Sequence, residues 1–121
     1  MMEYKVLVED GTTKWYYNGK LHREDGPAVE YSTGVKAWYK EGNLHREGGP
    51  ALEYPNGYKE WFKEGKFHRE DGPAVEYTNG NKDWYLEGEK LSEEEFLKRT
   101  NLHLCDKVVE VDGVKYTLVK V

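Results

Sequence analysis

Hydrophobic and polar positions recur along this chain with a period of 23 residues. From Trp15 onward, three successive rows align without a gap, and 12 of their 23 columns hold the same residue in every row. The rows are WYYNGKLHREDGPAVEYSTGVKA, WYKEGNLHREGGPALEYPNGYKE and WFKEGKFHREDGPAVEYTNGNKD. Such a period is typical of stacked architectures, in which each unit buries its apolar face against its neighbours. We expect the array, with partial units at both ends, to cover residues 4–88.

Each row contains a hairpin signal near its end. In the second row, Pro55-Asn56-Gly57 suits a type I turn followed by a glycine in the left-handed region. This loop sets a register in which each hairpin carries an opposite-charge pair, and such pairs favour strand pairing. The predicted pairs are Glu30 with Lys36, Glu53 with Lys59 and Glu76 with Lys82.

Two further reversals complete each row. A two-residue hairpin loop is predicted at Asn18-Gly19, Glu41-Gly42, Glu64-Gly65 and Glu87-Gly88. In the second row this loop pairs Trp38 with His45 and Tyr39 with Leu44. The sequence Asp25-Gly26-Pro27 predicts the third reversal, where we expect glycine to supply an unusual dihedral and proline to remove a backbone donor.

Strand alternation divides each unit into two faces. The face that we expect to form the core carries Val29, Tyr31, Ala37, Tyr39, Leu44 and Arg46. The opposite face is polar around a tryptophan and is the predicted recognition surface; it carries Ala28, Glu30, Lys36, Trp38, His45 and Glu47.

Residues 89–121 predict a cap for the last repeat. Ser92 is the expected N-cap of a short helix with Glu95 as its capping-box partner, and Phe96 and Leu97 would dock that helix. Residues 107–111 and 114–121 then alternate around Asp112-Gly113, which is a strong hairpin signal. The expected fold is a single all-β domain over residues 1–121, an elongated antiparallel sheet of stacked hairpins with a helix-plus-hairpin cap.

Composition narrows the possible functions. Leu, Ile, Val and Phe are scarce, so the 14% of aromatic residues must supply much of the core. A net charge of −5 makes extended nucleic acid an unfavoured partner. We expect a soluble, cytoplasmic protein without membrane contact, because the chain has no bilayer-length apolar run and no signal-like start. A single cysteine excludes an internal disulfide.

The pattern W-Y-x-x-G, then H-R-x-x-G-P-A, then E-Y-x-x-G-x-K at this period resembles the variant MORN repeats of bacteriophage and large-virus proteins. The resemblance covers about two-thirds of the chain, and the HRxDGPA segment departs from the ordinary MORN consensus. It implies an elongated sheet with a binding or scaffolding role, lipid or protein partners and no catalytic residues. It also implies a small phage-type accessory protein, located in the host cytoplasm, that blocks a host defence component or sequesters a nucleotide signal.

The repeated histidines and tryptophans are the candidate site residues. Equivalent histidines one unit apart would lie about 10 Å from each other, too far to share a metal ion, so neither a metal site nor a cofactor is expected. The histidines either pack against the next tryptophan or contact a ligand. The tryptophans either pack or, with nearby lysines, bind a base or a protein partner. The candidates are His22, His45, His68, Trp15, Trp38, Trp61, Trp84, Lys36, Lys59 and Lys82.

Arginine and glutamate also repeat side by side. Neighbouring strand residues point to opposite faces, so we expect each arginine to stack on a tyrosine between carboxylates rather than to form an acid–base dyad. Repetition itself argues against a catalytic centre, which is usually one asymmetric constellation. The variable column Tyr17, Lys40, Lys63 and Leu86 is free to specify a partner, and Gly48 stands where the other rows have aspartate.

The sequence therefore favours a non-enzymatic binding module whose partner is a host protein or a small nucleotide. One alternative is a small enzyme, a nuclease or nucleotide hydrolase, that uses one histidine and one carboxylate. Another is a structural assembly protein, since exposed sheet edges permit a homodimer.

Overall fold

Antiparallel strands make up nearly all of the regular structure. The structure, a computed structural model, describes residues 3–100, 108–111 and 114–117. Its elements are β1 Tyr4–Glu9, β2 Thr12–Tyr17, β3 Lys20–Leu21, β4 Val29–Glu30, β5 Lys36–Ala37, β6 Tyr39–Lys40, β7 Asn43–Leu44, β8 Leu52–Glu53, β9 Lys59–Glu60, β10 Phe62–Lys63, β11 Lys66–Phe67, β12 Val75–Glu76, β13 Lys82–Leu86, β14 Glu89–Leu91, α1 Glu93–Thr100, β15 Val108–Val111 and β16 Val114–Thr117. The predicted all-β hairpin fold with a short C-terminal helix is confirmed.

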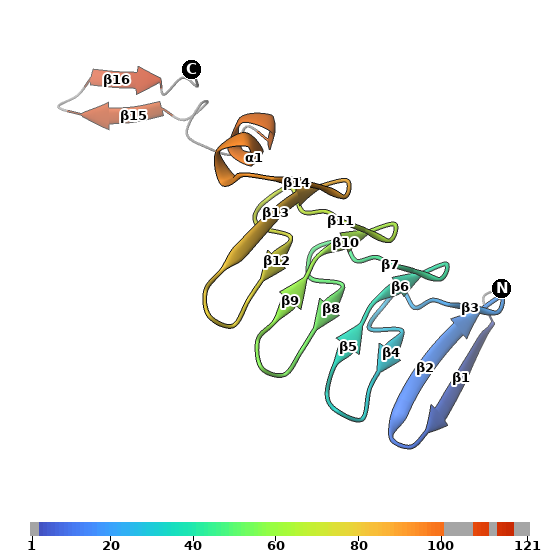
Figure 1. Ribbon diagram of the computed structural model, residues 1–121. Coiled ribbons are helices and arrows are strands. Elements are labelled where there is room, and N and C mark those ends of the chain that lie inside the picture. The colour runs from blue at the N-terminus through green and yellow to red at the C-terminus, as the bar shows by residue number, and fades with distance from the viewer. Residues whose placement is uncertain (1–2, 101–107, 112–113, 118–121) are drawn as a thin grey trace.

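The large hairpins share one long sheet. Ten strands form it, in the order β1-β2-β4-β5-β8-β9-β12-β13-β14 with β3 paired to β2. The pairs β6–β7 and β10–β11 form separate two-stranded sheets. In Figure 1 the large hairpins lie side by side in a row from β1 to α1, and the small hairpins follow the same row. We refer to residues 15–37, 38–60 and 61–83 as units 1, 2 and 3.

The predicted register of the large hairpins is confirmed. Glu30 pairs with Lys36, Glu53 with Lys59 and Glu76 with Lys82. Between hairpins, Lys36 pairs with Glu53 and Lys59 with Glu76, so glutamate and lysine alternate across the sheet. Because opposite charges face each other on neighbouring strands, this row favours the register both within and between units.

Both predicted turn types are present. At the first, the Gly34 N–H donates to the Tyr31 carbonyl over 2.9 Å, and Gly34 has a φ of 93°. At the second, both loop residues have positive φ, as a type I′ turn requires: 49° at Glu41 and 85° at Gly42. Asp10-Gly11, between β1 and β2, has the same conformation, with φ of 51° and 79°.

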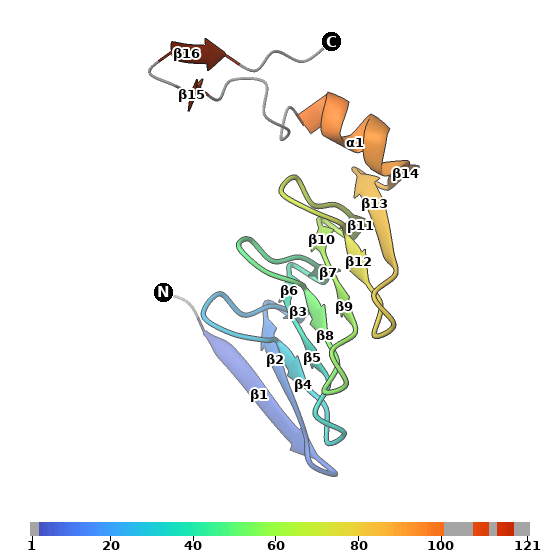
Figure 2. The same cartoon turned by 90° about the vertical axis from the view of Figure 1, so that its left-hand side faces the viewer.

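The buried apolar residues come from both faces of the strands. Val29 and Ala37 are buried as the face prediction requires, but Tyr31 on the same face is 40% exposed, and Ala28 on the opposite face is fully buried. The prediction that the face containing Ala28 is an open polar surface is therefore wrong. The segments that follow the small hairpins turn back over that face, and in Figure 2 they project to one side of the sheet.

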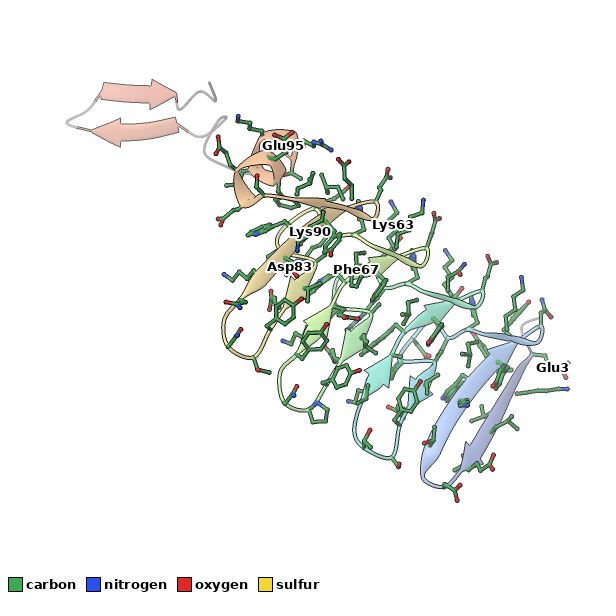
Figure 3. The ribbon with its side chains drawn as sticks, in the orientation of Figure 1. Glu3, Lys63, Phe67, Asp83, Lys90 and Glu95 are labelled. Carbon is green, nitrogen blue, oxygen red and sulfur yellow. The ribbon has the colours of Figure 1, made fainter. Side chains whose placement is uncertain are left out.

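The C-terminal end of the array is covered by α1. The Ser92 Oγ accepts a hydrogen bond from the Glu95 N–H over 3.1 Å, which confirms the predicted N-cap. Phe96 is fully buried, and its ring centroid lies 4.8 Å from that of Trp84. Next to it, Lys90 forms an ion pair with Asp83 at 3.6 Å across β13 and β14 (Figure 3).

The final hairpin is described in part. β15 pairs with β16 through Val111 and Val114, around the predicted Asp112-Gly113 turn. The turn itself and residues 107 and 118–121 of the prediction lie outside the described residues. Among the described residues, no helix has the length and apolar character needed to cross a membrane.

Candidate functional site

A stacked arginine and tryptophan occur in every unit. The guanidinium carbon lies 4.0 Å from the ring centroid in Arg23–Trp15, 3.8 Å in Arg46–Trp38 and 3.9 Å in Arg69–Trp61. The predicted stacking partner, tyrosine, is therefore wrong, and so is the placement of Arg46 on the face opposite Trp38. The chain leaves the sheet after His45, and strand alternation no longer applies beyond that point. Cation–π contacts of this kind contribute about 0.5–2 kcal/mol each, depending on desolvation.

A glycine and a proline also contact each guanidinium. A Cβ atom placed on Gly72 would lie 2.7 Å from the Arg69 Cζ, and the equivalent distances are 2.9 Å at Gly26 and 2.8 Å at Gly49. The Arg69 Nη1 also donates to the Pro73 carbonyl over 3.1 Å. None of these three glycines has a positive φ, so the expected unusual dihedral is wrong. Glycine is required because the guanidinium packs directly against the backbone.

The histidines connect successive units. The Nδ1 atom of His22 accepts a hydrogen bond from the Glu41 N–H over 3.0 Å, and the bond recurs from Glu64 to His45 at 3.0 Å and from Glu87 to His68 at 2.9 Å. An Nδ1 atom that accepts must be unprotonated, so the neutral ring carries its hydrogen on Nε2. The Nε2 of His22 lies 3.6 Å from the Glu24 carboxylate. Each histidine therefore fixes the tight turn of the following unit.

An open groove recurs between neighbouring units. We call residues 23–27, 46–50 and 69–73 the reversal loops, and each groove lies between two of them. Groove 1 has a volume of about 710 Å³ and is lined by the unit 1 loop, Trp38, Lys40 and His45. Groove 2 has a volume of about 540 Å³ and is lined by the unit 2 loop, Trp61, Lys63 and His68. Eleven of the 12 lining residues of each groove correspond across the 23-residue repeat.

Exposed carboxylates occupy the tips of the reversal loops. The side chain of Glu47 is 87% exposed and lines both grooves. Glu24 in groove 1 and Glu70 in groove 2 occupy the equivalent positions. Asp25 and Asp71 add a second carboxylate, and each accepts a hydrogen bond from the Nε of its own arginine, at 3.0 and 2.8 Å. The loop tips thus present acceptor groups at a regular spacing.

The predicted site residues are distributed over several places. Trp38, Trp61 and all three repeated histidines line the grooves, whereas Trp84 packs against α1. Lys36, Lys59 and Lys82 line neither groove, because they belong to the charge row of the sheet. Trp15 lines neither groove and packs against Tyr4, with ring centroids 5.9 Å apart.

A second aromatic cluster lies at the tips of the large hairpins. The ring centroid of Tyr58 lies 5.3 Å from that of Tyr54 and 5.5 Å from that of Tyr77. Burial, together with a hydrogen bond to Glu60, raises the pKa of Tyr58, and a 2.7 Å hydrogen bond to Asp83 raises the pKa of Tyr77.

On the small hairpins, Phe67 stacks between Phe62 and Tyr85, at centroid distances of 4.4 and 4.8 Å (Figure 3).

The sequence-based site omitted the residues that shape the grooves. The arginines and the Gly-Pro pairs are invariant in all three rows, but strand alternation places the arginine on the other face and the Gly-Pro pair is interpreted only as a turn. The fixed spacing of tryptophan, arginine, glycine and proline was the available signal. The variable column, by contrast, does contribute to the grooves through Lys40 and Lys63.

Within residues 3–100, 108–111 and 114–117, no group of three or more metal-ligating side chains comes together. Searches against protein-family models, curated proteins and solved structures found no match to this chain.

Proposed function

We propose that this chain is a non-enzymatic binding module that engages an extended, basic segment of a protein partner along the reversal loops. The observation that carries the proposal is the repetition of one groove, with exposed carboxylates on its rims, at a spacing of one unit. Two strands per unit give a spacing of about 10 Å. A peptide in the extended polyproline II conformation covers about 9 Å in three residues and presents every third side chain on the same side.

The charge of the groove rims favours a protein over a nucleotide. Glu24, Asp25 and Glu47 lie around groove 1, and a bound phosphate would meet them at close range. Each guanidinium keeps its charge but is held against an indole and a proline carbonyl, whereas the carboxylates at the loop tips are largely exposed and meet a ligand first. Lysine or arginine side chains of a partner would complement the rims instead.

The hydrogen bonds that the repeated histidines accept argue against the enzymatic alternative. A general base needs an accessible lone pair, but the Nδ1 of each repeated histidine already accepts a backbone N–H. The Nε2 of His22 is itself buried.

The variable residues give a route to partner specificity. Lys40 and Lys63 extend into grooves 1 and 2, beside the half-buried Trp38 and Trp61. Each of these two indoles is partly accessible, and tryptophan is frequent at interface hot spots. The phage-type setting and the host target implied by the resemblance to MORN repeats stay predictions.

Binding of designed peptides tests the proposal. The probe is a peptide of about 15 residues with lysine at every third position, and the comparison peptide has the same composition with its lysines clustered at one end. We expect the periodic peptide to bind more tightly in calorimetric titration, with an affinity that falls as salt is raised.

Charge-matched variants locate the binding surface. Replacing Glu24, Glu47 and Glu70 by glutamine is expected to weaken binding about tenfold. The control replaces Glu41, Glu64 and Glu87, the first residues of the tight turns, by glutamine; it changes the net charge equally and touches neither groove. Equal weakening by both triple variants, or no binding of either peptide, would contradict the proposal. Tight binding of a cyclic dinucleotide that depends on Lys63 would replace the protein partner by a nucleotide.

A further inference from the structure

The two ends of the long sheet differ. At the C-terminal end, β14 is three residues long and α1 packs against β13 and β14. At the other end, β1 is six residues long, and within the described part of the chain no strand pairs with its outer edge. Its middle residues are apolar and exposed: Val6 is 43%, Leu7 57% and Val8 71% accessible. A long apolar edge of this kind is a template for pairing with another strand.

The backbone of β1 determines which residues face outward. The Trp15 N–H donates to the Ala28 carbonyl over 2.7 Å, so Trp15 directs its hydrogen bonds away from β1. Val6 is paired with Trp15 and therefore directs its own N–H and C=O toward the free edge, because hydrogen-bonded and non-hydrogen-bonded pairs alternate in antiparallel sheets. The same alternation directs the backbone groups of Val8 outward and those of Lys5, Leu7 and Glu9 toward β2.

This alternation restricts how two copies of β1 could pair. Outward-directed residues must face outward-directed residues, so Val6 can pair with Val6 or Val8 of a second copy, but not with Leu7. If Val6 pairs with Val8, Leu7 meets its own equivalent on a two-fold axis, and Lys5 meets Glu9 on both sides of that axis.

The other registers that the backbone permits bring less favourable pairs of side chains together. Pairing Val6 with itself places Lys5 opposite Leu7 and leaves Glu9 without an opposite charge, and pairing Val8 with itself places Leu7 opposite Glu9 and leaves Lys5 without an opposite charge. Larger shifts place Lys5 opposite Lys5 or Glu9 opposite Glu9, and like charges directly opposite each other destabilise a sheet. Only one register therefore satisfies the backbone, the apolar residues and the charges together.

We propose that β1 pairs antiparallel with β1 of a second copy of this chain, with Leu7 on the two-fold axis and Lys5 opposite Glu9 of the second copy. The two sheets then become one continuous sheet through the dimer. Because α1 covers the opposite end of each array, the pairing closes after two copies and does not extend into a filament. This inference does not depend on the proposed basic partner.

Charge-reversal variants test the register. Lys5→Glu places glutamate opposite glutamate in its homodimer, and Glu9→Lys places lysine opposite lysine. In the mixed dimer both charge pairs become attractive. In sedimentation of the full chain, we expect the wild type to dimerise as its concentration rises, each variant alone to dimerise at least tenfold more weakly, and their equimolar mixture to recover the wild-type behaviour.

A cross-link tests the axis independently of the charge variants. With the only native thiol removed by Cys105→Ser, Leu7→Cys is expected to form a disulfide-linked dimer under mild oxidation, because non-hydrogen-bonded pairs bring their Cα atoms to about 4.5 Å. Val6→Cys is the matched control and should link much more slowly, since Val6 faces Val8. A wild-type chain that stays monomeric up to about 1 mM, a mixture no more dimeric than its components, or equal linking at both positions would each overturn the proposal.

Discussion

The reversal loop of unit 2 lacks the aspartate that units 1 and 3 contain. Comparing the loops separates the contribution of this aspartate from that of the contacts that all three loops share. Asp25 and Asp71 hold their arginines through the Nε atoms, whereas Gly48 stands at that position in unit 2 and has a φ of 84°. The Arg46 side chain is 29% exposed, compared with 20% for Arg23 and Arg69. Nevertheless, Arg46 stacks on its tryptophan as closely as the others do.

This comparison shows which contacts determine the loop. The indole, the glycine backbone and the proline carbonyl are present in every unit, so the guanidinium reaches the same position without the aspartate. The aspartate adds a further contact to an arginine that is already in place. Its contribution should be small, because its carboxylate is largely exposed.

Removing the shared tryptophan gives the largest expected effect. Trp61→Ala and Trp38→Ala should each lower the free energy of unfolding by about 3 kcal/mol, through lost packing and a guanidinium left without its platform. Urea denaturation followed by circular dichroism measures both. Costs that differ by more than about 1 kcal/mol would show that the two stacks are not equivalent.

Removing the arginine should lower the free energy of unfolding by different amounts in units 2 and 3. Arg69→Met loses the stack, the Asp71 contact and a 2.8 Å ion pair to Glu76, and we expect a cost of about 2 kcal/mol. Arg46→Met loses the stack and a 3.5 Å ion pair to Glu53, for which about 1 kcal/mol is expected. The same denaturation experiment applies, and a reversed order would contradict the comparison.

Removing the aspartate isolates the additional contact. Asp71→Ala and Asp25→Ala should each cost about 0.5 kcal/mol, less at high salt, because an exposed ion pair is screened. Thermal unfolding at low and high salt concentration is a suitable measurement. A loss as large as that for Arg69→Met would mean that the carboxylate, and not the indole, positions the guanidinium.

Adding an aspartate to unit 2 should have the smallest effect. Gly48→Asp supplies a carboxylate for the Arg46 Nε but requires the loop to leave its positive φ, since a side chain is strained there. If the loop adopts the conformation of its neighbours, we expect a gain of about 0.3 kcal/mol. Gly48→Ala provides the control: it makes the same demand on the loop without supplying the carboxylate, so it should be less stable than Gly48→Asp, and equal stability of the two variants would contradict a contribution from the carboxylate.

The sequence predicted the sheet better than the loops for a physical reason. The register followed from local turn chemistry, because the glycines fix the loop length and the Glu–Lys pairs favour one alignment. The contact between Arg46 and Trp38 required a chain path across one face of the sheet, and no local signal specifies such a path. The strand pattern therefore assigned these two residues to opposite faces.

The same limit applies to the candidate site. Trp38 and His45 were identified because their types and repetition suggested chemistry, and both line a groove. The acceptor role of the His45 Nδ1 could not be predicted, since its donor, the Glu64 N–H, lies 19 residues further along the chain.

The histidine bonds that connect each unit to the next have a consequence for the evolution of chain length. Every bond joins equivalent positions, so a copy of one row inserted between two others would find the same histidine acceptor before it and the same backbone N–H donor after it. Duplication of a 23-residue segment would lengthen the protein by about 10 Å and add one groove, with no new junction to optimise. The length of such a protein can therefore change by whole rows, and each additional row repeats the same spacing between grooves.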